Sequence, residues 1–213
     1  MALFQQKPQT SDPKGFYTVG ENKTYLIAGL GNPGNAYTLT RHNAGFMVVD
    51  HFVEKTDEME DWINKKDLKC LLSGGRLGES RVIAMKPTTF MNLSGEAVSA
   101  VISFYKINPK NILVVHDDLD VDFGQLRLRV GGSDAGNNGI KSVIQYIGED
   151  FGRIRVGIGP KNPPQIPSED FVLQKFSKEE QEQLPNMKQE AIAVITEFIY
   201  GGILPHDTRT FVV

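Results

Sequence analysis

The sequence has little cysteine: Cys70 is the single one among 213 residues. An internal disulfide and a multi-cysteine metal site are therefore excluded, and we interpret Cys70 as a small buried apolar residue. The sequence also has no apolar run of the roughly 20 residues that span a bilayer, and its N-terminus lacks the apolar segment of a signal peptide. These absences predict a cytoplasmic protein without a membrane partner.

Residues 1–23 lack both arginine and any helical or strand periodicity, and they contain two prolines. The missing arginine, together with Asp12 and Glu21, argues against an organelle transit peptide. We expect a flexible N-terminal extension over residues 1–23, a single domain over 24–204 and a C-terminal tail over 205–213.

A strong net charge is absent as well: 26 acidic and 23 basic residues give −3, which by itself indicates no nucleic-acid partner. Residues 124–161 differ, because this stretch is positive by three. Its charged residues are Arg127, Arg129, Lys141, Arg153, Arg155 and Lys161, against Asp134, Glu149 and Asp150. We interpret the stretch as a local phosphate-binding face, with a solvated charged surface as the alternative.

Apolar runs of strand length alternate with stretches of helical periodicity. The strand-like runs are 25–28, 68–72, 81–85, 112–115, 125–130 and 154–158. Helical patterns occupy 46–53, 98–105 behind an N-cap at Ser94, 140–147, and about 187–200, where Pro185 limits the start and Gly201-Gly202 the end. The alternation predicts an α/β fold, a single domain whose central sheet is covered by helices on both faces. A hairpin over 68–85, turning at 78–80, predicts that the sheet is mixed.

The segment GLGNPGNAYTLTRHNAG, residues 29–45, contains a glycine pattern that resembles a dinucleotide-binding loop. Such a loop opens a helix and is followed about 20 residues later by an acidic residue at a strand end. Residues 36–41 are too short and too β-branched for that helix, and Asp50 falls inside a helical pattern. We therefore interpret the glycines as turn residues that expose Asn32. A nicotinamide-dependent oxidoreductase stays as the alternative class of enzyme, which titration with NAD would test.

Three strand-to-helix connections each contain an asparagine: Asn32, Asn92 and Asn138. A further strand, 112–115, is followed directly by His116 and Asp117, and the carboxyl ends of strands are where open α/β sheets place their sites. Each asparagine alone would be ordinary turn chemistry. Together with a histidine and a carboxylate, the amides predict a site that binds a peptide backbone or an oxyanion and activates water.

The proline-rich loop 161–167 is followed by residues 170–176, which we expect to cover a site. The four histidines, His42, His51, His116 and His206, share no metal-ligand spacing, so we expect neither a metal nor another cofactor.

Four motifs make the chain resemble the bacterial-type peptidyl-tRNA hydrolase family. They are GLGNPGNAYTLTRHNAG, KPTTFMNLSGEAV, VVHDDLDVDFGQLRLRVGGSDAGNNGIKS and FGRIRVGIGP, in consistent order within residues 24–200. The resemblance implies hydrolysis of the ester between a peptide and tRNA, which recycles tRNA from prematurely released chains. It also implies a monomer whose partner is peptidyl-tRNA.

The resemblance assigns roles to matching residues. It implies a catalytic group of His42, Asp117 and Asn32. It implies contacts with the peptide and the acceptor end from Tyr37, Met91, Asn92 and Asn138, and contacts with tRNA phosphate from Arg129 and Arg155. Many members of that family have the sequence GGHNG where this chain has AGNNG at residues 135–139. Asn137 thus occupies a position that is often histidine, and we expect activity to persist.

We expect neutral His42 to act as general base for water, with Asp117 orienting its ring, and Asn32 or Asn92 to stabilise the oxyanion. Nucleophilic catalysis fits poorly, because the chain has no GxSxG turn. The alternative within the same fold is a non-catalytic RNA-binding relative. Loss of His42, Asp117 or Asn32 would mark that alternative, and all three are present.

Overall fold

Eight strands pair side by side in one sheet in the computed structural model, which describes residues 23–211. They are β1 (Thr24–Gly29), β2 (Ile63–Lys65), β3 (Cys70–Leu77), β4 (Ser80–Pro87), β5 (Ile112–Asp122), β6 (Gln125–Val130), β7 (Gly152–Gly159) and β8 (Asp207–Thr210). Their spatial order is β2-β3-β4-β1-β5-β7-β6-β8. The central strands β4, β1, β5 and β7 are parallel, and both ends of the sheet are antiparallel. The expectation of a mixed sheet is therefore confirmed.

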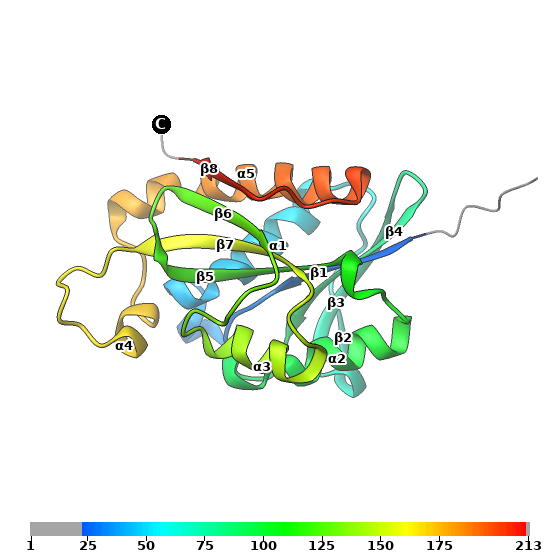
Figure 1. The fold of residues 1–213 in the computed structure, drawn as a ribbon, viewed down its shortest axis with the longest axis horizontal. Helices are drawn as coiled ribbons and strands as arrows, with labels where there is room; N and C mark the ends of the chain where they lie inside the picture. The colour runs from blue at the N-terminus through cyan, green and yellow to red at the C-terminus, as the bar shows by residue number, and fades with distance from the viewer. Residues whose placement is uncertain (1–22, 212–213) are drawn as a thin grey trace, which may run out of the picture.

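Helices cover both faces of this sheet, as the sequence predicts (Figure 1). The α-helices are α1 (Ala44–Lys55), α2 (Ser94–Tyr105), α3 (Asn138–Ile147), α4 (Ser168–Val172) and α5 (Lys178–Gly201). Short 3-10 helices are η1 (Asn35–Tyr37), η2 (Arg41–Asn43), η3 (Lys66–Leu68), η4 (Met91–Leu93) and η5 (Pro109–Asn111). One apolar core lies between the sheet and α1 with α5, and a second lies between the sheet and α2 with α3. None of the helices between residues 23 and 211 is long and apolar enough to cross a membrane.

The glycines of the 29–45 segment serve mainly to bring α1 against the sheet. A Cβ at Gly45 would overlap the backbone of Val115 and Leu30, and one at Gly29 would overlap the backbone of Gly45. Only Gly34, with φ of 107°, has the backbone of a turn residue that favours glycine. The interpretation of the pattern glycines as turn residues therefore holds at Gly34 and is wrong at Gly29; Gly45, outside that pattern, has the same packing role as Gly29. No α-helix opens at these glycines, since η1 follows them and α1 begins only at Ala44.

Helix α5 begins nine residues earlier than the sequence analysis places it. Its start is a capping box: the Ser177 hydroxyl accepts the backbone N–H of Glu180, and the Glu180 carboxylate accepts the N–H of Ser177. Pro185 lies inside the helix and does not start it. Gly202 ends it in the left-handed conformation, as expected.

Two further local expectations differ from the structure. Ser94 is the buried first residue of α2, whose N-cap is Leu93, because η4 runs directly into the helix. Residues 207–210, assigned above to a C-terminal tail, form β8, which pairs with β6 at the edge of the sheet. The expected extension lies, apart from Lys23, outside the described residues.

Candidate active site

The site lies where two neighbouring parallel strands end at different levels. Strand β1 pairs with β5 only as far as Gly29 opposite Val115, whereas β5 continues to Asp122. The apolar run predicts a strand that ends at Val115, whereas β5 is seven residues longer. Asp117 lies on the part of β5 that has lost its β1 neighbour, and its side chain faces a crevice at the carboxyl end of the sheet.

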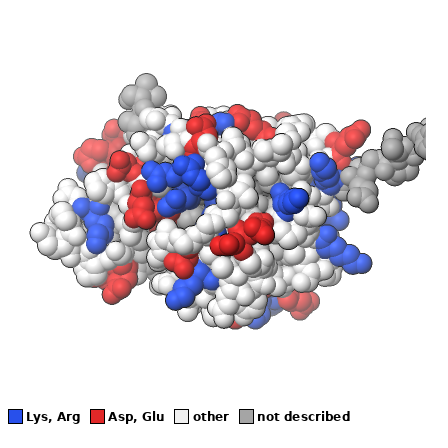
Figure 2. Space-filling view, viewed as in Figure 1, with Lys and Arg blue, Asp and Glu red and all other residues white. Residues whose placement is uncertain are grey.

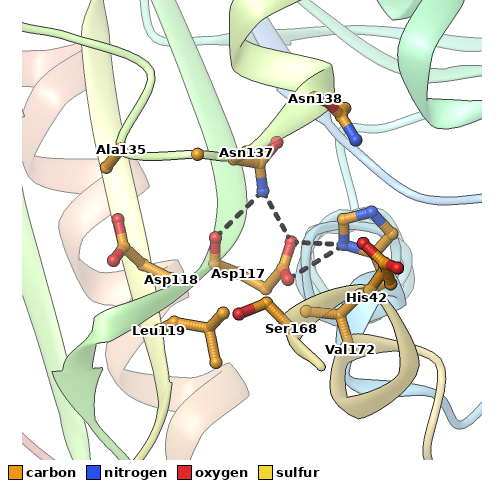
Figure 3. Close-up of a pocket in the computed structure, with 11 residues that line it drawn as sticks. His42, Asp117, Asp118, Leu119, Ala135, Asn137, Asn138, Ser168 and Val172 are labelled. Carbon is orange, nitrogen blue, oxygen red and sulfur yellow. Dashed lines mark hydrogen bonds and ion pairs between the residues drawn. The ribbon is translucent and has the colours of Figure 1, made fainter. Parts of the chain in front are cut away.

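His42 and Asp117 form the centre of this crevice (Figure 3). The short helix η2 holds His42, whose Nδ1 lies 2.9 Å from Oδ2 and 3.0 Å from Oδ1 of Asp117. Asp117 is 2% exposed. Because an ionised carboxylate only accepts hydrogen bonds, Nδ1 carries the hydrogen in the neutral ring and Nε2 carries the lone pair.

The environment of His42 raises its pKa. Burial of the imidazole lowers the pKa, but the negative charge of Asp117 and the hydrogen bond to it together outweigh burial, so the net direction is upward from the ordinary value. The ring therefore gains a proton more readily than an isolated histidine. That property suits a group that takes a proton from water.

Asn32 is held in place by two other residues. The Asn43 side chain accepts the backbone N–H of Asn32 at 2.8 Å and donates to the carbonyl of Asn32 at 3.0 Å. The Asn32 side-chain oxygen accepts the backbone N–H of Met91 at 2.9 Å. Since the oxygen is occupied, the NH₂ group of Asn32 is the part left to donate to a bound molecule.

Three of the four predicted peptide-end residues come together around one pocket with His42 and with Asn32, which was predicted as catalytic. Asn32, Met91, Asn92 and Asn138 line it, from the connections after β1 and β4 and from the start of α3. Tyr37 does not line this pocket: its ring packs edge-on against Phe90, which does. Tyr37 thus lies behind the pocket wall.

Helix α4 forms the opposite wall: Val172 belongs to the expected cover, whereas Ser168 and Glu169 were not predicted. Ser168 and Glu169 line the pocket of the His–Asp pair, and Val172 lines this pocket and the neighbouring one (Figure 3). The expected cover, residues 170–176, is confirmed only in part, because Phe171 and Phe176 turn inward and stack on the Arg41 guanidinium. For Ser168 and Glu169 the only signal in the sequence is their position directly after the proline-rich loop 161–167.

The predicted phosphate-binding arginines lie together on the open part of the α2/α3 face. Arg127 and Arg129 of β6 stand opposite Arg155 and Arg153 of β7. Lys and Arg side chains gather over these two strands (Figure 2). Arg129, Arg153 and Arg155 line one pocket, separated from the His–Asp pocket by the loop 131–137.

The three pocket arginines differ in what they bond. Arg153 is buried and donates to the carbonyls of Gly132 and Ser133, so it holds the loop. Arg155 uses Nε to bind the buried Asp118 carboxylate at 2.6 Å. Arg129 donates through Nη1 to two backbone carbonyls, at Leu128 and Asp207. Arg129 and Arg155 each keep a further terminal nitrogen for an anion.

Within residues 23–211, no three histidine, cysteine, aspartate or glutamate side chains lie close enough together to hold a metal ion. Fold and site together define an α/β protein with a histidine–aspartate pair in a polar crevice, next to a basic pocket.

Comparison with known proteins gives the family. The family described as Peptidyl-tRNA hydrolase matches residues 26–211. The chain is 46% identical over 180 residues to a peptidyl-tRNA hydrolase of Clostridium botulinum strain Alaska E43, covering 84% of this chain and 91% of that one. It is 42% identical over 179 residues to a peptidyl-tRNA hydrolase of Gloeobacter violaceus, covering 84% and 89%.

A crystal structure of peptidyl-tRNA hydrolase from Acinetobacter baumannii superposes with a TM-score of 0.77 at 34% identity, covering 84% of this chain and 90% of that one. The chain belongs to the peptidyl-tRNA hydrolase family of enzymes. The resemblance found in the sequence is thereby confirmed.

Proposed function

We propose that the protein hydrolyses the ester bond between the carboxyl end of a peptide and the terminal ribose of tRNA, with His42 as general base. Membership of the family supports the reaction. The observation that carries the assignment of the base is the contact of His42 Nδ1 with the Asp117 carboxylate, which directs the basic Nε2 away from Asp117.

The reaction begins when Nε2 of neutral His42 takes a proton from a water molecule as the water oxygen attacks the ester carbonyl. Asp117 keeps the ring in the required tautomer and stabilises the imidazolium that forms. The tetrahedral intermediate then collapses, the bond to the ribose oxygen breaks, and the imidazolium returns its proton to that oxygen. The products are a free peptide carboxyl group and tRNA, without a covalent enzyme intermediate.

Asn32 is the amide best arranged to stabilise the oxyanion. Its side-chain oxygen is bound by Met91 and its backbone by Asn43, so its NH₂ group has a fixed direction. A preorganised donor of this kind typically lowers the barrier by about 3 kcal/mol. Asn92 and Asn138 then remain to bind the peptide and the acceptor end, with Met91 as an apolar contact.

Substrate recognition is bipartite. The crevice receives the ester, and the pocket of Arg129 and Arg155 receives phosphate of the tRNA backbone. The two pockets lie on opposite sides of the loop 131–137 and share Ala135 as a lining residue, so one extended substrate is expected to reach both. We also propose that the enzyme acts as a monomer in the cytoplasm and needs no metal.

The test is release of N-acyl amino acid from N-acyl-aminoacyl-tRNA without added metal. We expect turnover by the wild type and a loss of at least 10²-fold in His42→Ala, the lower end of what a general base contributes. His51→Ala, in the middle of α1, is the matched control and should retain turnover. Near-full turnover by folded His42→Ala would overturn the assignment of the base. A wild type that binds tRNA without turnover would favour the non-catalytic RNA-binding relative.

A further inference from the structure

The side chain of Asn137 makes four hydrogen bonds, which link helix α3 to Asp117. Its side-chain oxygen accepts the backbone N–H groups of Gly139 at 2.9 Å and Ile140 at 3.1 Å, which caps α3. Its Nδ2 donates to Asp117 twice, to Oδ1 at 2.9 Å and to the backbone carbonyl at 3.1 Å (Figure 3).

The direction of this amide is determined by its partners. A flipped Asn137 would set its oxygen against two oxygens of Asp117 and its NH₂ against two N–H groups. All four contacts are favourable only in the observed orientation. Asn137 is therefore a fixed donor toward Asp117.

Asp117 receives side-chain hydrogen bonds from two residues only within the described chain: the ring of His42 and the amide of Asn137. The carboxylate is buried, so water does not replace a lost donor easily. With Asn137 in place, Oδ1 is bound from two sides, and rotation of the carboxylate would break a contact. The hydrogen bonds of His42 Nδ1 to this carboxylate in turn set the orientation of the ring.

We infer that Asn137 is a positioning residue for the proposed reaction: it holds Asp117 so that His42 keeps Nδ1 on the carboxylate and Nε2 toward the attacking water. The inference rests on the proposed function. Asn137 acts through Asp117. Its amide does not titrate, so it donates equally at every pH.

Other charged groups around the pair are few. Glu169 of α4 and Asp118 of β5 line the same pocket, and Asp118 is paired with Arg155. Asp134, in the loop before Asn137, accepts the backbone N–H of Gly136. The charge of Asp118 is balanced by Arg155, whereas Glu169 and Asp134 carry the same sign as Asp117, so a negative charge at position 137 would add to theirs. His116, whose Nδ1 lies 2.8 Å from the backbone carbonyl of Asp117, is a further titratable group beside the pair.

Two substitutions separate the helix cap from the contact with Asp117. Asn137→Asp keeps an oxygen for Gly139 and Ile140 but replaces the donor by a carboxylate. Asn137→Ser also keeps a capping oxygen, and its side chain is too short to bridge to Asp117. Asn108→Asp is the matched control, because Asn108 caps η5 at an exposed position through the backbone N–H of Lys110.

We expect kcat to fall about tenfold or more in both Asn137 variants, the size of a lost hydrogen bond to a charged group, while KM changes by less than about threefold. In Asn137→Asp the acid limb of the pH–rate profile moves to higher pH, since the added charge favours protonated His42. Asn137→His, which supplies a ring N–H, should recover most of kcat. Asn108→Asp should match the wild type.

NMR titration of the His42 ring tests the same point without activity. We expect the His42 pKa to rise in Asn137→Asp and to stay at the wild-type value in Asn108→Asp. The inference is overturned if both Asn137 variants keep the wild-type kcat and His42 titration, or if kcat falls only as far as thermal stability does. Absence of wild-type turnover would instead contradict the proposed function. The NMR titration would still decide whether Asn137 acts on the pair of His42 and Asp117.

Discussion

The side-chain oxygen of Asn32 accepts the backbone N–H of Met91 at 2.9 Å, so the connection after β1 is bonded to the connection after β4 through one amide. Only the NH₂ group of Asn32 is left for the substrate. This arrangement separates two duties of Asn32 that different substitutions can test.

Asn32→Asp should keep the acceptor for Met91 and lose the donor toward the oxyanion. We expect kcat to fall by about 10²–10³-fold, as for loss of one oxyanion donor. Asn32→Ala should lower kcat at least as much and, because the bond to Met91 is also lost, should reduce thermal stability. Asn35→Ala, an exposed asparagine of the same connection, is the control. Single-turnover rates near wild type in folded Asn32→Asp would assign the oxyanion to another group.

The pH dependence of the reaction should follow His42. Burial lowers the pKa of this ring, yet the charge and hydrogen bond of Asp117 raise the pKa by more, so the base becomes neutral only above its ordinary value of about 6.5. We expect kcat/KM to fall as pH decreases through this raised pKa. In Asp117→Asn only the effect of burial remains, so the acid limb should move to lower pH while the maximum decreases. Rate profiles between pH 5 and 8 measure both, and an unmoved limb would show that another group titrates.

Affinity for tRNA should depend on salt through the arginine pocket. Each phosphate contact releases counterions, so Arg129→Ala should weaken binding and reduce the slope of log K against log[salt] by about one. The double variant Arg129→Ala/Arg155→Ala should reduce this slope by about two. Because Arg155→Ala leaves the buried Asp118 without its partner, thermal unfolding must accompany that measurement. Arg76→Ala/Arg81→Ala, on β3 and β4, is the control. An unchanged slope in Arg129→Ala would exclude this pocket.

Arg41 should matter for stability more than any exposed arginine. Its side chain, 8% exposed, binds the Glu180 carboxylate at 2.6 Å and stacks on two phenylalanine rings. We expect Arg41→Met to lower the free energy of unfolding by about 3 kcal/mol, since Glu180 loses its partner. Arg209→Met removes a more exposed pairing with Glu197 and should cost less than about 1 kcal/mol. Urea unfolding followed by circular dichroism compares them, and equal losses would contradict the expectation.

The fold and the centre of the site were predictable because they depend on local patterns. Alternating strand and helix patterns are enough to predict a covered mixed sheet, and side chains at the carboxyl ends of parallel strands meet at one edge. Asn32, Met91, Asn92 and Asn138 are accordingly brought around one pocket with His42.

The rest depends on contacts between distant segments, which a single sequence does not reveal. Gly29 is interpreted as a turn residue unless the backbone of Gly45 is known to lie against it. Pro185 marks a helix start unless Ser177 and Glu180 cap the helix earlier. Asn137 reads as a departure from the family pattern, and only the packing of α3 beside β5 reveals its bond to Asp117.

The two walls of the crevice are built from parts of unequal local stability. Asp117 belongs to β5, an interior strand, and such strands open only near the free energy of global unfolding. The facing wall is α4, a helix of five residues, too short to be stable by itself. Contacts with the rest of the protein stabilise α4: Phe171 is buried and stacks on the guanidinium of Arg41, the neighbour of His42. We therefore expect the α4 wall and the segment that holds His42 to loosen together.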